Sequence, residues 1–178
     1  MRGLKSALRK ELIARRKAMD PNEKRKADAD IFEQIKPYLD KAETVFTYAS
    51  SKIEVDTRRI IEYCLQNNIP IALPVSGDTM LDFYFINSED QLKKGRFGID
   101  EPPRNRKAEP SRGCLCIVPA LCADGNGFRL GYGRGYYDRF LAYFTGRSVT
   151  ICYNRFKQDV PKEEHDIKTD VTIFDRLP

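Results

Sequence analysis

The chain has 178 residues, of which 41% are hydrophobic and 32% are charged, so it fits one globular domain with a buried core. Its 31 basic and 26 acidic side chains leave a formal net charge of +5, which suits either an anionic small molecule or a nucleic acid. No apolar run has the length of a membrane span, and the charged N-terminal segment differs from an export signal. We therefore expect a cytoplasmic protein.

The first part of the chain is predicted to be helical. Residues 3–18 carry leucines at a helical spacing. Residues 20–23 then combine an N-cap aspartate, a proline at the first helical position and the glutamate of a capping box. This second helix should end near Pro37.

Strands and helices alternate in the rest of the chain. We expect strands over residues 44–49, 69–75, 114–121, 148–153 and, more weakly, 171–174, with 80–86 as the hairpin partner of 69–75. Helices are expected over 57–67, from residue 88 and over 136–144, and a long loop over 94–113. This order predicts a single α/β domain over 1–178, in which a mixed, mostly parallel sheet has helices on both faces, a three-layer arrangement.

The five cysteines form no familiar metal or disulfide pattern. Only one residue separates Cys114 from Cys116, which is too short for a standard zinc knuckle, and the chain has one histidine. We expect reduced thiols in or near the core. They are Cys64, Cys114, Cys116, Cys122 and Cys152.

Residues 128–138, with the sequence FRLGYGRGYYD, are the most informative segment. Glycines allow backbone N–H groups to approach a ligand closely, and arginines pair with phosphate oxygens. The spacing fits neither the P-loop nor the dinucleotide-binding pattern. We interpret the segment as a phosphate-binding loop in which Arg129 and Arg134 clamp the anion; the alternative is a glycine-rich turn.

Other candidate side chains have two interpretations each. Asp138 either compensates a helix dipole or helps to hold Mg2+, and Glu54 is either an exposed loop acid or a ligand group at the carboxyl end of a strand. Lys5 and Arg9 share one helix face, and the simpler interpretation of such a pair is a helix face exposed to solvent. His165, next to Asp166, is either a surface residue or part of a metal or phosphate site.

The glycine segment, preceded by Val118-Pro119-Ala120, resembles the 5-formyltetrahydrofolate cyclo-ligase family, also called 5,10-methenyltetrahydrofolate synthetases. The likeness extends over nearly the whole chain, since short motifs at 5–9, 54–57, 97–102 and 165–166 follow in family order. The sequence departs from the family pattern at 120–123, and the segment 168–174 is only loosely similar.

The resemblance implies an ATP-dependent enzyme that converts 5-formyltetrahydrofolate to 5,10-methenyltetrahydrofolate, with ADP and phosphate, through an iminophosphate. It implies catalytic roles for Arg134 and Tyr137 and magnesium binding by Asp138 and Asp166. The implied ATP-binding residues are Lys5, Ser6, Ala7, Leu8, Arg9, Arg129, Leu130, Gly131, Tyr132, Gly133, Arg134, Gly135, Tyr136 and Tyr137. The implied substrate-binding residues are Tyr48, Ala49, Glu54, Phe97, Gly133 and Tyr136.

We therefore expect a monomer that binds a reduced folate, ATP and Mg2+, without a nucleic-acid or membrane partner. An RNA-binding module is the alternative from another class, supported by the positive charge and by arginines in the 94–113 loop, although the basic residues are spread out and no standard RNA motif is present. A sugar-phosphate isomerase on a similar sheet is a second alternative, because fold alone does not determine function.

Overall fold

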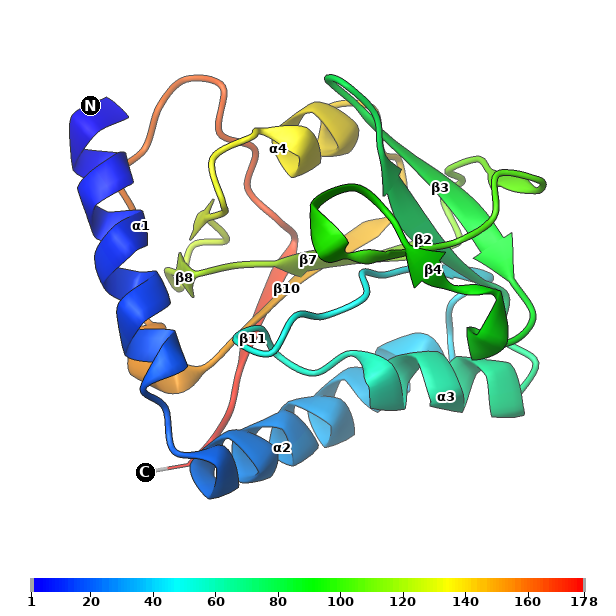
Figure 1. Cartoon of the computed structure of the whole chain (residues 1–178), viewed down its shortest axis with the longest axis horizontal. Coiled ribbons are helices and arrows are strands. Elements are labelled where there is room, and N and C mark those ends of the chain that lie inside the picture. The colour runs from blue at the N-terminus through cyan, green and yellow to red at the C-terminus, as the bar shows by residue number, and fades with distance from the viewer. Residues whose placement is uncertain (1, 178) are drawn as a thin grey trace.

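A computed structural model describes residues 2–177 and confirms the predicted α/β architecture (Figure 1). Within these residues seven strands form one sheet in the order β11-β10-β7-β1-β2-β3-β6. The first five are mutually parallel, whereas β3 and β6 join as antiparallel strands. The strands are β1 (Thr44–Phe46), β2 (Ile71–Ser76), β3 (Leu81–Ile86), β6 (Lys107–Ala108), β7 (Cys114–Pro119), β10 (Arg147–Cys152) and β11 (Val171–Phe174).

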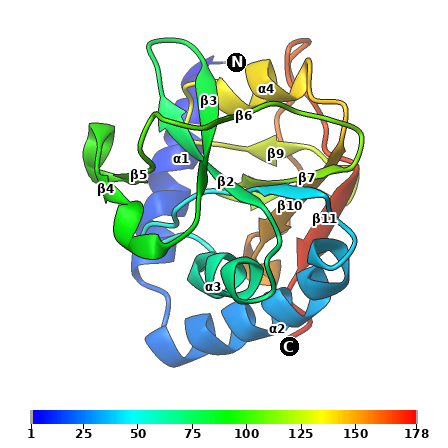
Figure 2. The same ribbon diagram turned by 90° about the vertical axis from the view of Figure 1, so that its right-hand side faces the viewer.

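Helices cover both faces of the sheet, as the alternating pattern predicts (Figure 2). Helices α2 (Pro21–Leu39) and α3 (Arg58–Gln66) lie on one face, and the short α4 (Tyr136–Leu141) lies on the other. Helix α1 (Arg2–Lys17) stands beside the end of β7, at the carboxyl edge of the parallel strands (Figure 1). Ligands of open α/β sheets bind at this edge.

Two apolar clusters hold the layers together. The larger one joins Leu12 of α1 and Ile35 of α2 to Ile117 of β7. The smaller one packs Phe140 of α4 against Phe46 and other apolar residues of the opposite sheet face. The five cysteines are all free and buried, as expected from their apolar contexts. Burial raises the pKa of Cys64 to about 12, which makes that thiol unreactive at neutral pH.

The helices differ from the expectations at four places, one of which is the segment from residue 88, where only a 3-10 turn, Glu89–Gln91, forms. The Asp20 side chain accepts hydrogen bonds from two backbone N–H groups, which confirms the N-cap. Glu23 does not close the predicted capping box; its carboxylate accepts a hydrogen bond from Arg155 instead. Helix α2 continues past Pro37 to Leu39, which is buried and anchors the last turn in the core. Helix α4 ends at Leu141, not at residue 144, because the chain must turn before entering β10.

The segment 94–113 contains more regular structure than expected. Strands β4 (Lys93–Lys94) and β5 (Asp100–Glu101) form a small hairpin, and β6 extends the main sheet. Between β4 and β5 lies a short 3-10 turn, η2 (Arg96–Gly98). Two-residue strands carry too weak a periodic pattern to be recognised from sequence. The expected strands 44–49 and 114–121 are shorter in the structure, ending at Phe46 and Pro119.

None of the helices within residues 2–177 is both long enough and apolar enough to cross a membrane.

Candidate active site

A cleft of about 1210 Å3 opens at the carboxyl edge of the parallel strands. Residues that follow β1, β2 and β7 line it, together with the N-terminal half of α1 and the 163–167 segment. Almost all of the predicted site residues meet here. They are Lys5, Arg9, Tyr48, Ala49, Glu54, Phe97, the whole run 129–138 and Asp166. Among the described residues, only Ser6, Ala7 and Leu8 of the predicted set do not line the cleft.

The glycine loop connects β9 (Arg129–Leu130), which pairs with β8 (Cys122–Ala123), to α4. Gly133 and Gly135 have φ values of 100° and 65°, a backbone region that other residues rarely adopt. Arg9 Nε donates a hydrogen bond of 2.8 Å to the carbonyl of Gly131. A Cβ atom at Gly133 would lie 3.1 Å from the Arg9 guanidinium carbon, so the loop depends on glycine there.

The two arginines of the loop have different environments. Arg129 is buried and donates to the Asp138 carboxylate at 3.0 Å and to the Ile167 carbonyl at 2.6 Å. Arg134 is exposed, and its guanidinium carbon lies 4.0 Å from the centre of the Phe97 ring. Stacking occupies only the face of a guanidinium, so the N–H groups at its edge remain able to bind an anion. Arg129 therefore shapes the site, whereas Arg134 faces the cleft.

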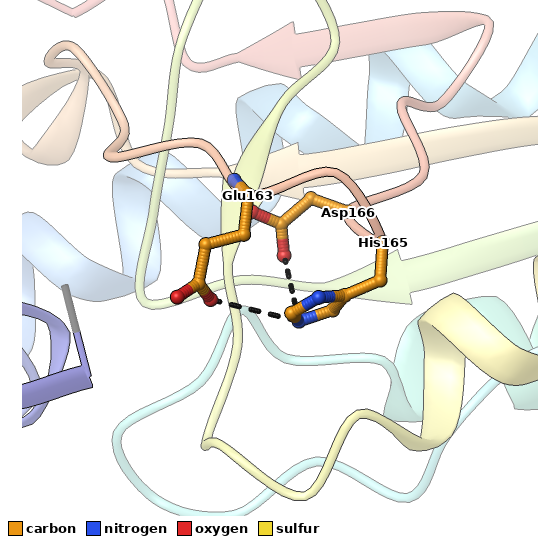
Figure 3. A group of neighbouring side chains, drawn as sticks. All are labelled: Glu163, His165 and Asp166. Atoms are coloured by element: carbon orange, nitrogen blue, oxygen red, sulfur yellow. Dashed lines mark hydrogen bonds and ion pairs between the residues drawn. The ribbon is translucent and has the colours of Figure 1, made fainter.

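Two acids and the histidine form a cluster in the 163–167 segment of the cleft lining. Glu163, His165 and Asp166 each offer a ligand atom within 4.8 Å of the others (Figure 3). Asp138 lies outside this group, although its carboxylate accepts the backbone N–H of Ile167, the residue next to Asp166. Sequence reasoning missed Glu163. The signal that could have found it is its spacing two residues before the histidine.

Lys5 pairs with two of these carboxylates. Its Nζ lies 2.6 Å from Asp166 Oδ2 and 2.9 Å from Glu163 Oε2, and only 5% of the residue is exposed. Burial alone would lower the pKa of Lys5, but the hydrogen bonds to Asp166 and Glu163 outweigh it and raise the pKa. For Asp166 burial favours a higher pKa, which the bonds from Lys5 and the Glu163 N–H overcome, so the pKa is lowered. All three groups are charged at neutral pH.

The rest of the cleft lining includes aromatic residues and the acids Glu54 and Glu101. Glu54 accepts the backbone N–H of Ser51 at 2.7 Å. Phe97 is 50% exposed and has a φ of 64°, a strained conformation for a bulky residue. The hydroxyl of Tyr137 is buried and has no hydrogen-bond partner among residues 2–177. Burial raises the pKa of Tyr137 well above its usual value, so the hydroxyl keeps its proton.

Comparisons with known proteins show the family of this chain. The sequence profile of the 5-formyltetrahydrofolate cyclo-ligase family matches residues 2–175. The chain belongs to this family. It is 28% identical to the 5-formyltetrahydrofolate cyclo-ligase of Mycoplasma pneumoniae, over 96% of this chain and 98% of the relative. It is also 28% identical to that of Escherichia coli K12, over 86% of this chain and 90% of the relative.

A solved structure supports the cyclo-ligase assignment. The 5,10-methenyltetrahydrofolate synthetase of Aquifex aeolicus matches with a TM-score of 0.86 and 30% identity, covering 98% of this chain and 91% of that chain. The family is one of enzymes whose names specify 5-formyltetrahydrofolate and its methenyl product. This assignment favours the enzyme interpretation over the RNA-binding alternative.

Proposed function

We propose that the protein uses ATP and Mg2+ to convert 5-formyltetrahydrofolate to 5,10-methenyltetrahydrofolate, releasing ADP and phosphate. The observation that carries the proposal is a single cleft of about 1210 Å3 that contains both a glycine-arginine loop and an acid set among aromatic rings. Sites for one small ligand usually occupy about 300–1,000 Å3. This cleft is larger than that. It also combines a glycine-arginine part with an aromatic part that contains Glu54, so it has room for two different co-substrates side by side.

The chemistry explains why an activating phosphate is needed. A formyl oxygen is a poor leaving group, so we propose that it first attacks the γ-phosphorus of ATP and displaces ADP, which gives the iminophosphate. N10 then attacks the formyl carbon and loses its proton, and the carbon–oxygen bond breaks to release inorganic phosphate. Phosphoryl transfer of this kind requires chiefly positioning and neutralisation of charge.

The side chains of the cleft match these requirements. Arg134 and Lys5 carry the positive charge that would stabilise the transferring phosphoryl group. The backbone N–H groups of the glycine loop would hold the remaining phosphates. Glu54 would accept N–H groups of the pterin, while Phe97 would stack on its ring. Tyr137, which is also expected to be catalytic, lines the cleft, although its hydroxyl is buried.

The residues present also fit a magnesium ion. Mg2+ prefers oxygen ligands and commonly takes one or two carboxylates together with phosphate oxygens. Asp166 and Glu163 would hold the ion, and Asp138 lies nearby. The positive charge of the ion would then neutralise the two carboxylates, which Lys5 neutralises in this structure. When bound, the ion would neutralise phosphate charge.

One assay tests the proposed function. Purified protein is mixed with 5-formyltetrahydrofolate, Mg2+ and ATP, and the absorbance of the methenyl product is followed. We expect product only when ATP is present, and no product from the folded protein would overturn the proposal. Arg134→Ala and Asp138→Asn should each greatly depress turnover with an unchanged circular dichroism spectrum. Arg104→Ala, which alters an exposed loop arginine outside the cleft, is the matched control.

A further inference from the structure

Three buried polar side chains form hydrogen bonds with the backbone of the loop that carries Glu54. Tyr153 follows β10 and is 1% exposed, Arg16 in α1 is 3% exposed, and Asp28 in α2 is 8% exposed. None of the three lines the cleft among its described residues. Burying polar groups costs free energy unless their partners are well placed.

Tyr153 and Asp28 contact the backbone that directly follows the Glu54 side chain. The Tyr153 hydroxyl lies 2.9 Å from the Glu54 carbonyl oxygen and 2.7 Å from Asp28 Oδ1. The same Asp28 oxygen accepts the backbone N–H of Asp56 at 3.0 Å. Burial, together with the Asp28 carboxylate, raises the pKa of Tyr153, so its hydroxyl keeps its single proton, which the two acceptors share. These contacts fix residues 54–56 relative to α2.

Arg16 connects the same loop to the end of β7. It donates to the carbonyl of Ile53 at 2.9 Å and to the carbonyl of Ala120, at the end of β7, at 2.7 Å. Its guanidinium lies over the ring of Tyr153, with its carbon 5.2 Å from the ring centre. One planar cation therefore joins the Glu54 loop to the residues that directly follow β7.

We propose that Tyr153, supported by Arg16 and Asp28, is a positioning residue that places the Glu54 carboxylate for the folate. The proposal rests on the proposed function, because Glu54 is the residue expected to bind the pterin. A carboxylate that must meet N–H donors at hydrogen-bond distance needs a backbone that does not shift, and a loop lacks the support that a strand provides. Tyr153 acts through Glu54 and does not contact the substrate itself.

The test deletes one oxygen atom. Tyr153→Phe keeps the ring but removes the hydroxyl, and Tyr63→Phe is the matched control because it removes a hydroxyl that donates to Asp40 at 2.6 Å outside the cleft. We measure the Kd for 5-formyltetrahydrofolate without ATP, the KM for both substrates and the melting temperature. Tyr153→Phe should weaken folate binding about tenfold, the scale of one buried hydrogen bond, with the KM for ATP unchanged. Tyr63→Phe should leave both values unchanged.

A double-mutant cycle separates positioning from a general structural role. If Tyr153 acts through Glu54, folate binding by the variant carrying both Glu54→Ala and Tyr153→Phe should be no weaker than binding by Glu54→Ala alone. Multiplied effects, or a parallel rise in the KM for ATP, would overturn the proposal. Arg16→Lys keeps the charge but shortens the reach to Ile53, so it should weaken folate binding in the same direction and serves if Tyr153→Phe does not fold.

The outcomes distinguish the two proposals. Wild-type protein that binds and converts the folate, with Tyr153→Phe unaffected, overturns only the positioning role. Wild-type protein that binds the folate but forms no product overturns the proposed function, and the binding data still decide the role of Tyr153. Wild-type protein that does neither overturns both.

Discussion

The Nζ atom of Lys5 lies 2.6 Å from Oδ2 of Asp166, although the two residues are separated by 161 positions in the chain. This pair joins α1 to the segment that precedes β11 and closes one end of the cleft. The ammonium expected to contact ATP is therefore neutralised by the carboxylates expected to hold a cation.

Replacement of Lys5 should affect metal and nucleotide in opposite directions. In Lys5→Met the carboxylates of Asp166 and Glu163 lose their internal cation, so Mn2+ measured by electron paramagnetic resonance without nucleotide should bind more tightly. The affinity for ATP should fall at least about tenfold, because a charge-assisted hydrogen bond is lost. Lys10→Met, at an exposed position of the same helix, is the control. Unchanged Mn2+ affinity in Lys5→Met would show that the ammonium does not compete for this site.

The same pair should make stability depend on pH. The pKa of folded Asp166 lies below its ordinary value of 3.8, so its contribution is present above pH 3.8 and is lost as the pH falls through the lower, folded pKa. The pKa of Lys5 is raised above 10.5, so its contribution is present below that value and lost in strong base. The difference in melting temperature between wild type and Lys5→Met should therefore shrink in acid. A difference that stays constant from pH 7 to 3 would contradict this assignment.

Glu163 should contribute to magnesium binding. Glu163→Gln keeps the shape of the side chain but removes a charge from the cluster, so more Mg2+ should be needed for half-maximal activity, and Mn2+ should bind more weakly. Glu164→Gln, one residue later and exposed, is the control. Removal of the metal with a chelator should stop turnover in both variants, and excess Mg2+ should restore it. Equal Mn2+ affinities of the two variants would exclude Glu163 as a ligand.

Gly133 should not tolerate a side chain. In Gly133→Ala the new Cβ would meet the Arg9 guanidinium at 3.1 Å, on a backbone with a φ of 100°. We expect a loss of about 1–3 kcal/mol in the free energy of unfolding, the usual cost of such a conformation, together with weaker ATP binding. Chemical denaturation measures the first effect. Gly125→Ala, where nothing lies within 4 Å of the new atom and φ is ordinary, should be nearly neutral.

The Phe97 ring should contribute to binding more than to stability. Because the residue is 50% exposed, Phe97→Ala should leave the melting temperature nearly unchanged. It removes the ring expected to stack on the pterin, and such aromatic stacking is worth about 0.5–1.5 kcal/mol, so the KM for the folate should rise roughly two- to tenfold. Tyr143→Ala, at an aromatic residue that is 47% exposed and outside the cleft lining, is the control. Equal effects of the two substitutions would contradict a specific role for Phe97.

The sequence by itself predicted the α/β alternation and the phosphate loop, because both depend on local patterns. Apolar periodicity marks helices and strands, and the glycines at 131, 133 and 135 mark a backbone that must approach a ligand. The same local reasoning failed at Pro37, where burial of Leu39 outweighs the proline, and in residues 94–113, where pairing partners distant in the chain create β6.

Tertiary structure alone decided which polar groups meet. The pairing of Lys5 with Glu163 and Asp166, the stacking of Arg134 on Phe97, and the bond from Tyr153 to the Glu54 carbonyl join residues between 37 and 161 positions apart. No local pattern encodes such contacts, because they arise only when the packed layers bring strand ends and α1 together. The glycine loop could therefore be predicted from the sequence, whereas the contacts that support the Glu54 loop are seen only in the folded structure.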